Sequence, residues 1–183
     1  LLLSMSSIKA SDSEWNKLFE CMDKLKKFPL LRLTWTDNQI DHNSFYSFLS
    51  SCTRLQYLNI SRCLTSNLPS VFFKINDSIS NLPLLNTIIL TGHEKRPLQN
   101  ELEPFLTNLI NLKSLRILDI SNNLIDNNTF HYVAKLLSKN ISIHTINLDG
   151  SQIDCLDPYN EIINICIQKL TPVYVSWPSI DIS

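Results

Sequence analysis

Histidines are the residues of this chain best suited to proton transfer or metal binding, and their spacing favours neither. The four histidines, at positions 42, 93, 131 and 144, are spread along the sequence. His131 falls in a helical pattern but has no second ligand type four positions later, which a metal-binding pair on one helix face would need. The sequence therefore predicts no metal site.

The other motifs of enzymes and cofactor-binding proteins are missing from the sequence. With only two glycines, Gly92 and Gly150, the chain has no G-x-G-x-x-G or Walker loop to hold a phosphate, and it has no G-x-S-x-G elbow. Glu101 and Glu103 are two residues apart, so on a helix they point to different sides. Two acidic residues in a first turn are favoured by the helix dipole alone. We expect no catalytic residue, no cofactor and no enzymatic activity.

Charge and hydropathy exclude two further classes of partner. A formal net charge of −1 gives no electrostatic basis for binding nucleic acid or an anionic membrane. No apolar run approaches the length of a membrane span. We expect neither a nucleic-acid nor a membrane partner.

One stretch organises the chain, residues 115–125. It reads L-x-x-L-x-I-x-x-N-x-I, which is a leucine-rich-repeat pattern. Leu115, Leu118 and Ile120 are the inward positions of a short strand and its approach. Asn123 follows, where the chain turns, and its amide is expected to bond the turn backbone.

The same pattern recurs along essentially the whole sequence. Full copies start at residues 30, 55, 85, 115, 143 and 170, with spacings of 25 to 30. A partial copy, Leu1-Leu3-Ser6-Ile8, opens the chain in what we expect to be the second half of a strand. Since solenoid ends need polar caps, we expect residues 1–183 to form a single domain within a longer array that continues upstream.

Strands and helices are predicted to alternate. Expected strands cover 31–35, 56–60, 86–90, 116–120, 144–148 and 171–175. Apolar residues at helical spacing predict a helix over 12–27, with Asp12 or Ser13 as its N-cap, and helices over 43–51 and 68–82 and around 102–109 and 130–137. A last helix is expected to be capped by Asp157-Pro158. Parallel strands lie about 4.8 Å apart but helices need about 8–10 Å, so the array must curve with its strands inside. The expected fold is an α/β solenoid with a concave parallel sheet and convex helices.

A period of 25 to 30 with a helix in each repeat resembles the ribonuclease-inhibitor-like class of leucine-rich-repeat proteins. That class includes tropomodulin-type and CARMIL-type actin regulators, Ran GTPase-activating proteins and sensors of innate immunity. The resemblance implies the fold, whereas function differs widely between members. Only Asn38 and Asn123 keep the turn asparagine; Cys63 is a known substitute, and His93, Ser151 and Pro178 depart further.

The strand face pointing into the concavity is the candidate binding surface. In each repeat the third and fifth residues point away from the core, and the seventh and eighth lie at the rim. We predict that a protein partner contacts Arg32, Tyr57, Asn59, Arg62, Thr87, Ile89, Ile117, Asp119, Asn147 and Asp149. Tyr57, Ile89 and Ile117 are expected to form an exposed apolar centre. The arginines lie toward the N-terminal half of the face and the acidic residues toward the C-terminal half. In the last repeat, Pro172 and Tyr174 are expected on this face and Trp177 at its rim. The alternative is that β-branched and aromatic residues occur here only because they favour strands.

These features favour a non-enzymatic, monomeric protein-binding scaffold. The alternative is a GTPase-activating or actin-regulatory protein of the same class, although the scattered arginines (Arg32, Arg62, Arg96, Arg116) do not mark one as catalytic. An odd number of cysteines, five, without C-x-x-C spacing favours a reducing compartment and hence the cytoplasm.

Overall fold

A computed structural model describes residues 1–24, 29–63, 68–93, 97–98, 101–151 and 156–176. Strand and helix alternate along the chain. The strands are β1 (Leu2–Ser6), β2 (Arg32–Thr36), β3 (Tyr57–Asn59), β4 (Thr87–Ile89), β5 (Ile117–Asp119), β6 (Thr145–Asn147) and β7 (Tyr174–Ser176). The helices are α1 (Asp12–Lys24), α2 (Asn43–Ser51), α3 (Leu68–Ser80), α4 (Leu102–Leu109), α5 (Asn127–Lys139) and α6 (Asp157–Gln168).

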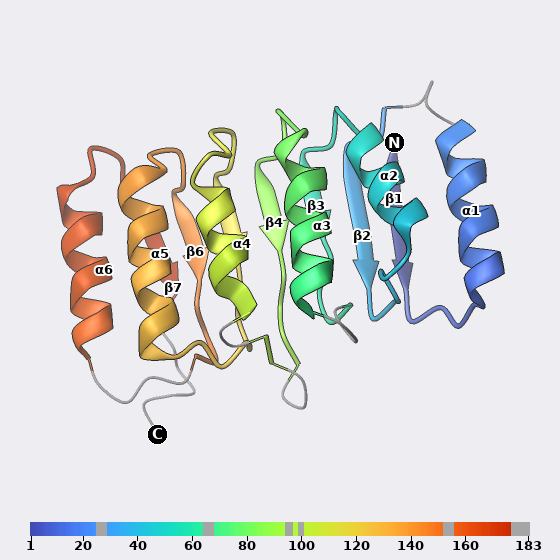
Figure 1. The fold of residues 1–183 in the computed structure, drawn as a ribbon. Helices are drawn as coiled ribbons and strands as arrows, with labels where there is room; N and C mark the ends of the chain where they lie inside the picture. The colour runs from blue at the N-terminus through green and yellow to red at the C-terminus, as the bar shows by residue number, and fades with distance from the viewer. Residues whose placement is uncertain (25–28, 64–67, 94–96, 99–100, 152–155, 177–183) are drawn as a thin grey trace.

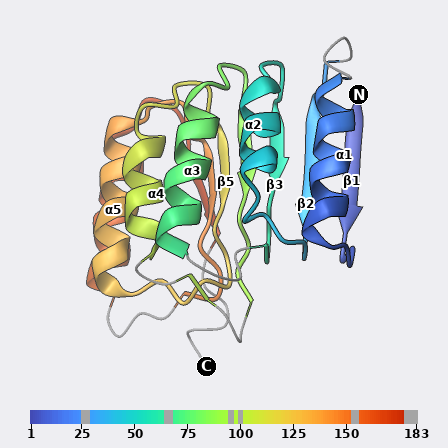
Figure 2. The same ribbon diagram turned by 45° about the vertical axis from the view of Figure 1, so that its right-hand side comes forward.

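The seven strands form one parallel sheet in the order of the sequence, β1 to β7. All six helices lie on the same side of the sheet, and each packs beside the helix of the next repeat (Figures 1 and 2). Among the described residues, no helix lies on the other face of the sheet. The predicted α/β leucine-rich-repeat solenoid is confirmed.

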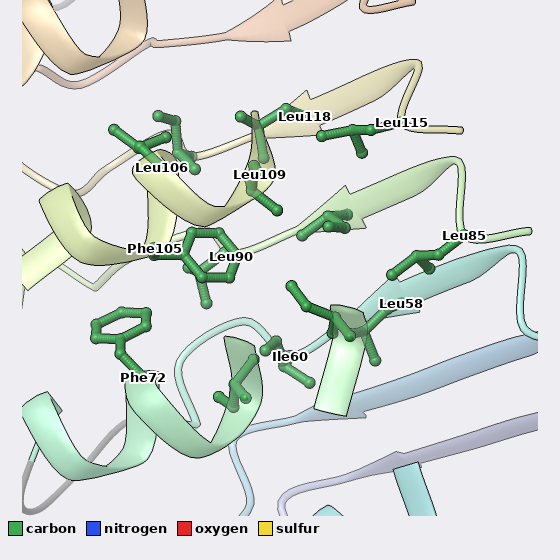
Figure 3. Close-up of a cluster of buried hydrophobic side chains, with 14 of the residues drawn as sticks. Leu58, Ile60, Phe72, Leu85, Leu90, Phe105, Leu106, Leu109, Leu115 and Leu118 are labelled. Carbon is green, nitrogen blue, oxygen red and sulfur yellow. The ribbon is translucent and has the colours of Figure 1, made fainter. Parts of the chain in front are cut away.

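The core lies between the sheet and the helices. The predicted inward residues of the third repeat, Leu55, Leu58 and Ile60, are buried, and so are their equivalents in the next two repeats. From the helix side, Phe72 and Phe105 reach into the same layer (Figure 3), with ring centroids 5.5 Å apart. Each such side chain contributes about 1.5–3 kcal/mol by leaving water.

An aromatic cluster fills the N-terminal end of this layer. Trp35 occupies the position that leucine or isoleucine holds in later repeats, and its indole ring packs against Trp15, Phe19 and Phe45. Trp15 and Phe19 lie four residues apart on α1, and both are buried. The wide rings fill this end of the core.

Turn residues join neighbouring repeats at the strand ends. The Asn123 amide nitrogen donates to the carbonyls of Leu90, in the preceding repeat, and of Ile120, at 2.8 and 2.9 Å. It also donates to Ser121 O, and Asn123 Oδ1 accepts from the Leu98 N–H. The predicted bonding of Asn123 to its turn is confirmed.

The equivalent turn residues of other repeats differ in whether they bond to the preceding repeat. Asn38 reaches the Met5 carbonyl at 3.1 Å, and the Cys63 thiol donates to the Trp35 carbonyl, so both also connect two repeats. Ser151 donates to Leu148 O, within its own repeat. His93 is exposed, and the turn residues from 94 to 96 are outside the described part of the chain, as are Ile153 and Pro178.

The first and last repeats differ from the sequence prediction by two residues. Leu3 pairs with Leu33 and Met5 with Trp35, so Leu3 takes the inward position expected for Leu1, and Met5 takes the one expected for Leu3. β1 pairs along its whole length with β2, so the expected half-strand is wrong; the longer array stays a prediction. At the other end Val175, not Val173, pairs with Ile146, and Leu170 is fully exposed.

Helix starts also differ in two places. Ser11, not Asp12 or Ser13, precedes α1. Its backbone N–H and its hydroxyl both donate to Glu14 Oε2, and its carbonyl accepts from the Glu14 N–H. Asp157 lies inside α6, whose N-cap is Leu156, so it is not the cap that we expected. The interior strands have three residues instead of five, and α3 ends at Ser80, two residues before the predicted end at 82; α1 is described to Lys24.

Asn123→Ala should destabilise the protein by about 1–3 kcal/mol, because it leaves buried carbonyls and an N–H without partners. Ser151→Ala should cost clearly less, since the serine hydroxyl makes one bond within its own repeat. Urea midpoints of the two variants measure the difference. Equal losses would show that the asparagine has no special role.

Gly92→Ala should also destabilise the protein. A Cβ atom at residue 92 would lie 2.1 Å from the Asn122 carbonyl oxygen and 2.4 Å from Asn123 Oδ1, too close without moving backbone. Overpacking of this kind costs about 1–3 kcal/mol. Thr91→Ala, beside it on a half-buried site, is the control for thermal unfolding, and an unchanged midpoint for Gly92→Ala would contradict the close approach.

Candidate functional site

Strand register arranges the predicted binding residues in two rows across the helix-free face, called here the concave face. The first row holds the first residue of each strand from β2 onward, namely Arg32, Tyr57, Thr87, Ile117, Thr145 and Tyr174. The second row holds Thr34, Asn59, Ile89, Asp119, Asn147 and Ser176. Arg62 and Asp149 lie beyond the strand ends. The structure therefore brings the predicted residues onto one face and its rim.

The apolar centre of this face is less exposed than the sequence predicted. Tyr57, Ile89 and Ile117 are each half-buried, and Thr87, between Tyr57 and Ile117, is only 9% exposed. Short threonine side chains are covered by longer neighbours across the strands. The exposure predicted for Tyr57, Ile89 and Ile117 is therefore only partial, and the three residues do lie together.

Three predicted contact residues have a structural role that the sequence reasoning missed. Asn59 Oδ1 accepts from the backbone N–H and the hydroxyl of Ser61, and Asp119 Oδ1 accepts in the same way from Ser121. Asn147 Oδ1 accepts from the Asp149 N–H at 3.2 Å. Each side chain caps the chain two residues on, as an Asx turn does. The sequence did hold a signal for this role: an Asn or Asp recurs at the fifth position of the repeat, two residues before a Ser or Asp.

Ile89 interrupts this series, and a neighbouring repeat compensates. Its side chain has no acceptor, and the Thr91 N–H donates instead to the Ser61 hydroxyl oxygen at 3.1 Å. The Ser61 hydroxyl in turn donates to Asn59. The backbone N–H of Thr91, in the turn after Ile89, thus finds its acceptor in the preceding repeat.

The two arginines of the N-terminal half have different environments. Arg62 forms a two-pronged ion pair with Asp37, with Nε–Oδ1 and Nη2–Oδ2 distances both 2.7 Å. This pair holds the pKa of the Asp37 carboxyl below its usual value, chiefly through the Arg62 hydrogen bond. Arg32 instead lies over the Tyr57 ring, with its Cζ 4.0 Å from the ring centroid. The positive charge expected in the N-terminal half of the concave face therefore comes from Arg32, because Asp37 neutralises the charge of Arg62.

In the C-terminal half, polar residues form a connected network. Asn147 Nδ2 donates to Asp119 Oδ2 at 3.1 Å, and the Ser176 hydroxyl donates to Asn147 Oδ1. Tyr174, 67% exposed, and Ser176 occupy the concave positions that the sequence assigned to Pro172 and Tyr174. The assignment of Pro172 to this face is wrong, and Trp177 lies outside the described residues.

Among the described residues, titratable groups outside the concave face do not form a second candidate site. His131 Nδ1 lies 2.8 Å from Glu161 Oε2, between exposed positions of α5 and α6 on the helix side. Within the described ranges, no group of three or more His, Cys, Asp or Glu residues could hold a metal ion. No helix in the same ranges is both long and apolar enough to cross a membrane.

No protein-family model and no curated protein matches the chain. An internalin (inlF) from Listeria monocytogenes has a similar solved structure, with 15% identity, a TM-score of 0.43, and coverage of 97% of this chain and 54% of the internalin. A Bacteroides fragilis protein solved by a structural genomics consortium is 13% identical, with a TM-score of 0.52, over 80% of this chain and 40% of its own. The chain thus spans about half or less of each; the second likeness supports the fold alone.

Arg62→Gln should raise the pKa of Asp37 toward its ordinary value of 3.8, because the hydrogen bond that lowers it is lost. A carboxyl whose pKa is depressed by folding adds stability above its unfolded pKa, and this contribution is lost as the pH falls through the folded value. The variant should be less stable by no more than about 1 kcal/mol near neutral pH, since the pair is partly exposed. Below 3.8 the difference should shrink.

Carbon-13 titration of the Asp37 carboxyl and denaturation at neutral and acidic pH measure these two effects. Arg54→Gln removes an exposed cation outside the concave rows and is the control. A stability difference that is equal at both pH values would contradict a role for the pair.

Proposed function

We propose that this protein is a non-enzymatic scaffold that binds a protein partner on its concave face. The observation that carries the proposal is the row of Tyr57, Thr87 and Ile117, where two large, half-buried side chains flank a small one on a face that no helix covers (Figure 2). Protein interfaces concentrate their energy in such central aromatic or apolar anchors within a polar surround. Hydroxyl and amide groups of the neighbouring strands supply that surround.

The polar surround suits recognition because its geometry is set before binding. Asn59, Asp119 and Asn147 are held by hydrogen bonds to the turns that follow them. A partner therefore meets side chains that lose little conformational freedom on contact. Predicted contacts at Arg32, Ile89 and Asp149 extend the surface to either side.

The finer assignment is a ribonuclease-inhibitor-like, monomeric protein of the cytoplasm. Full helices of 8 to 13 residues in the repeats support the class. Free thiols at Cys21, Cys52, Cys63 and Cys166 suit a reducing compartment. A GTPase-activating role would need an arginine free to reach a nucleotide; Arg62 is held by Asp37. Of the two arginines in the N-terminal half of the concave face, Arg32, exposed over the Tyr57 ring, is therefore the candidate for that role. If affinity capture recovers a small GTPase, its rate of GTP hydrolysis with and without this protein distinguishes a GTPase-activating protein from a scaffold.

Tyr57→Ala and Ile117→Asp should each weaken partner binding by on the order of 2 kcal/mol, because they remove the central anchors. Lys135→Glu, at an exposed position of α5, should leave binding unchanged. Affinity capture from the native cell identifies the partner, and calorimetry with purified partner measures each variant. Loss of binding in Lys135→Glu with normal binding in both concave variants would place the site on the helices.

Folding and binding effects are separated by a matched variant. Ile117→Thr copies the threonines found at positions 87 and 145 of the same row, so it preserves a β-branched strand residue. It should keep a cooperative thermal transition and still lose part of the affinity. Full affinity in Ile117→Thr would show that Ile117→Asp acts by disturbing the sheet.

A further inference from the structure

We propose that the partner of the concave face places a carboxylate side chain on Arg32. The inference rests on the proposed function and specifies the chemistry of the partner. It names a protein segment that carries an aspartate or glutamate opposite β2, followed by an apolar residue opposite β5.

Arg32 is the uncompensated cation of this face. The seven strands contain two charged residues, Arg32 and Asp119. Asp119 lies three strands away, about 14 Å at the usual strand spacing, which exceeds the screening length of about 8 Å at physiological salt. Both of its carboxylate oxygens already accept hydrogen bonds from Ser121 and Asn147. It does not neutralise Arg32.

The guanidinium of Arg32 is also positioned for a second interaction. Its Cζ atom lies 4.0 Å from the centroid of the Tyr57 ring, within the range of a cation–π contact. A guanidinium held by its flat face keeps its N–H groups free at the edge. Throughout the described part of the chain, those N–H groups find no acceptor and no carboxylate.

A carboxylate fits this arrangement better than other groups do. Two parallel N–H donors match the two oxygens of a carboxylate, and the planar fork loses less freedom than a lysine would. Arg62 shows the same pairing inside the protein, where both prongs hold Asp37 at 2.7 Å. Arg32 offers the same chemistry without an internal partner.

The spacing on the face adds a second requirement. Arg32 on β2 and Ile117 on β5 belong to the same row and are separated by three strand steps. An extended peptide covers about 14 Å in roughly four residues. The best ligand therefore carries an acidic residue and an apolar residue about four positions apart.

A random-peptide library displayed on phage tests this inference directly. Peptides selected on the wild-type protein should be enriched in Asp or Glu, with an apolar residue about four positions away. Synthetic copies should bind Arg32→Gln at least about tenfold more weakly, as expected for loss of a charged hydrogen-bonded pair. Arg32→Lys keeps the charge but not the fork, so its affinity should lie between the two.

Arg54→Gln removes the same charge from an exposed loop position and should bind the peptides normally. Because Arg32 is exposed, thermal unfolding of Arg32→Gln should match the wild type. A library that yields no binder, or selected peptides without acidic enrichment, overturns the acidic ligand. So does equal affinity for the wild type and Arg32→Gln.

The same peptides distinguish this inference from the proposed function. If they lose affinity for Ile117→Thr but not for Arg32→Gln, the concave face binds and only the acidic specificity is wrong. If they bind Ile117→Thr, Tyr57→Ala and Arg32→Gln as well as the wild type, the concave face is not the binding surface and both fail.

Discussion

The bond between a turn and the repeat before it is the interaction on which this structure depends. Where each strand ends, the backbone turns toward the helix layer and leaves buried carbonyls. Asn38, Cys63 and Asn123 each donate to a carbonyl of the preceding repeat. Leaving such groups unpaired costs about 1–3 kcal/mol each. Because every repeat contacts only its neighbours, each of these bonds helps to fix the stacking distance and the register of the two repeats that it joins.

That register determines which positions remain available for recognition. In the second row, Asn59, Asp119 and Asn147 are partly committed to their own turns. In the described structure, the first-row side chains make no such hydrogen bond to the following turn. Their residue types vary from arginine and tyrosine to threonine and isoleucine. A change in the first row therefore alters the surface at little structural cost, whereas a change in the second row also releases a turn. Specificity is expected to reside mainly in the first row.

The sequence predicted the interior repeats well and the end repeats poorly, for one physical reason. A strand alternates with a period of two, so a shift of two residues keeps the same side chains facing inward. Leu1 and Leu3 fit the pattern as well as Leu3 and Met5 do, and only pairing with Leu33 and Trp35 decides between them. In the interior, turns and helices on both sides fix the register. Which residues share the concave face was thus predictable up to β6.

Exposure and charge pairing on that face were not predictable, because they depend on residues 25 to 30 positions away. The burial of Thr87 depends on the lengths of its neighbours Tyr57 and Ile117. Likewise, Asp37 and Arg62 meet because both adopt a left-handed backbone conformation, with φ of 56°, at the same point of successive turns.

The most constrained turn of the rim directly follows the apolar centre of the concave face. Both glycines of the chain lie against it: a Cβ atom at Gly92 or Gly150 would come within 2.1 or 2.6 Å of Asn122. Asn123, fully buried beside them, holds the same turn by four hydrogen bonds. Ile117 and Asp119 on β5 lead into this turn, so their positions are set before any partner arrives. Binding at this point then costs less ordering entropy than binding to a mobile surface would.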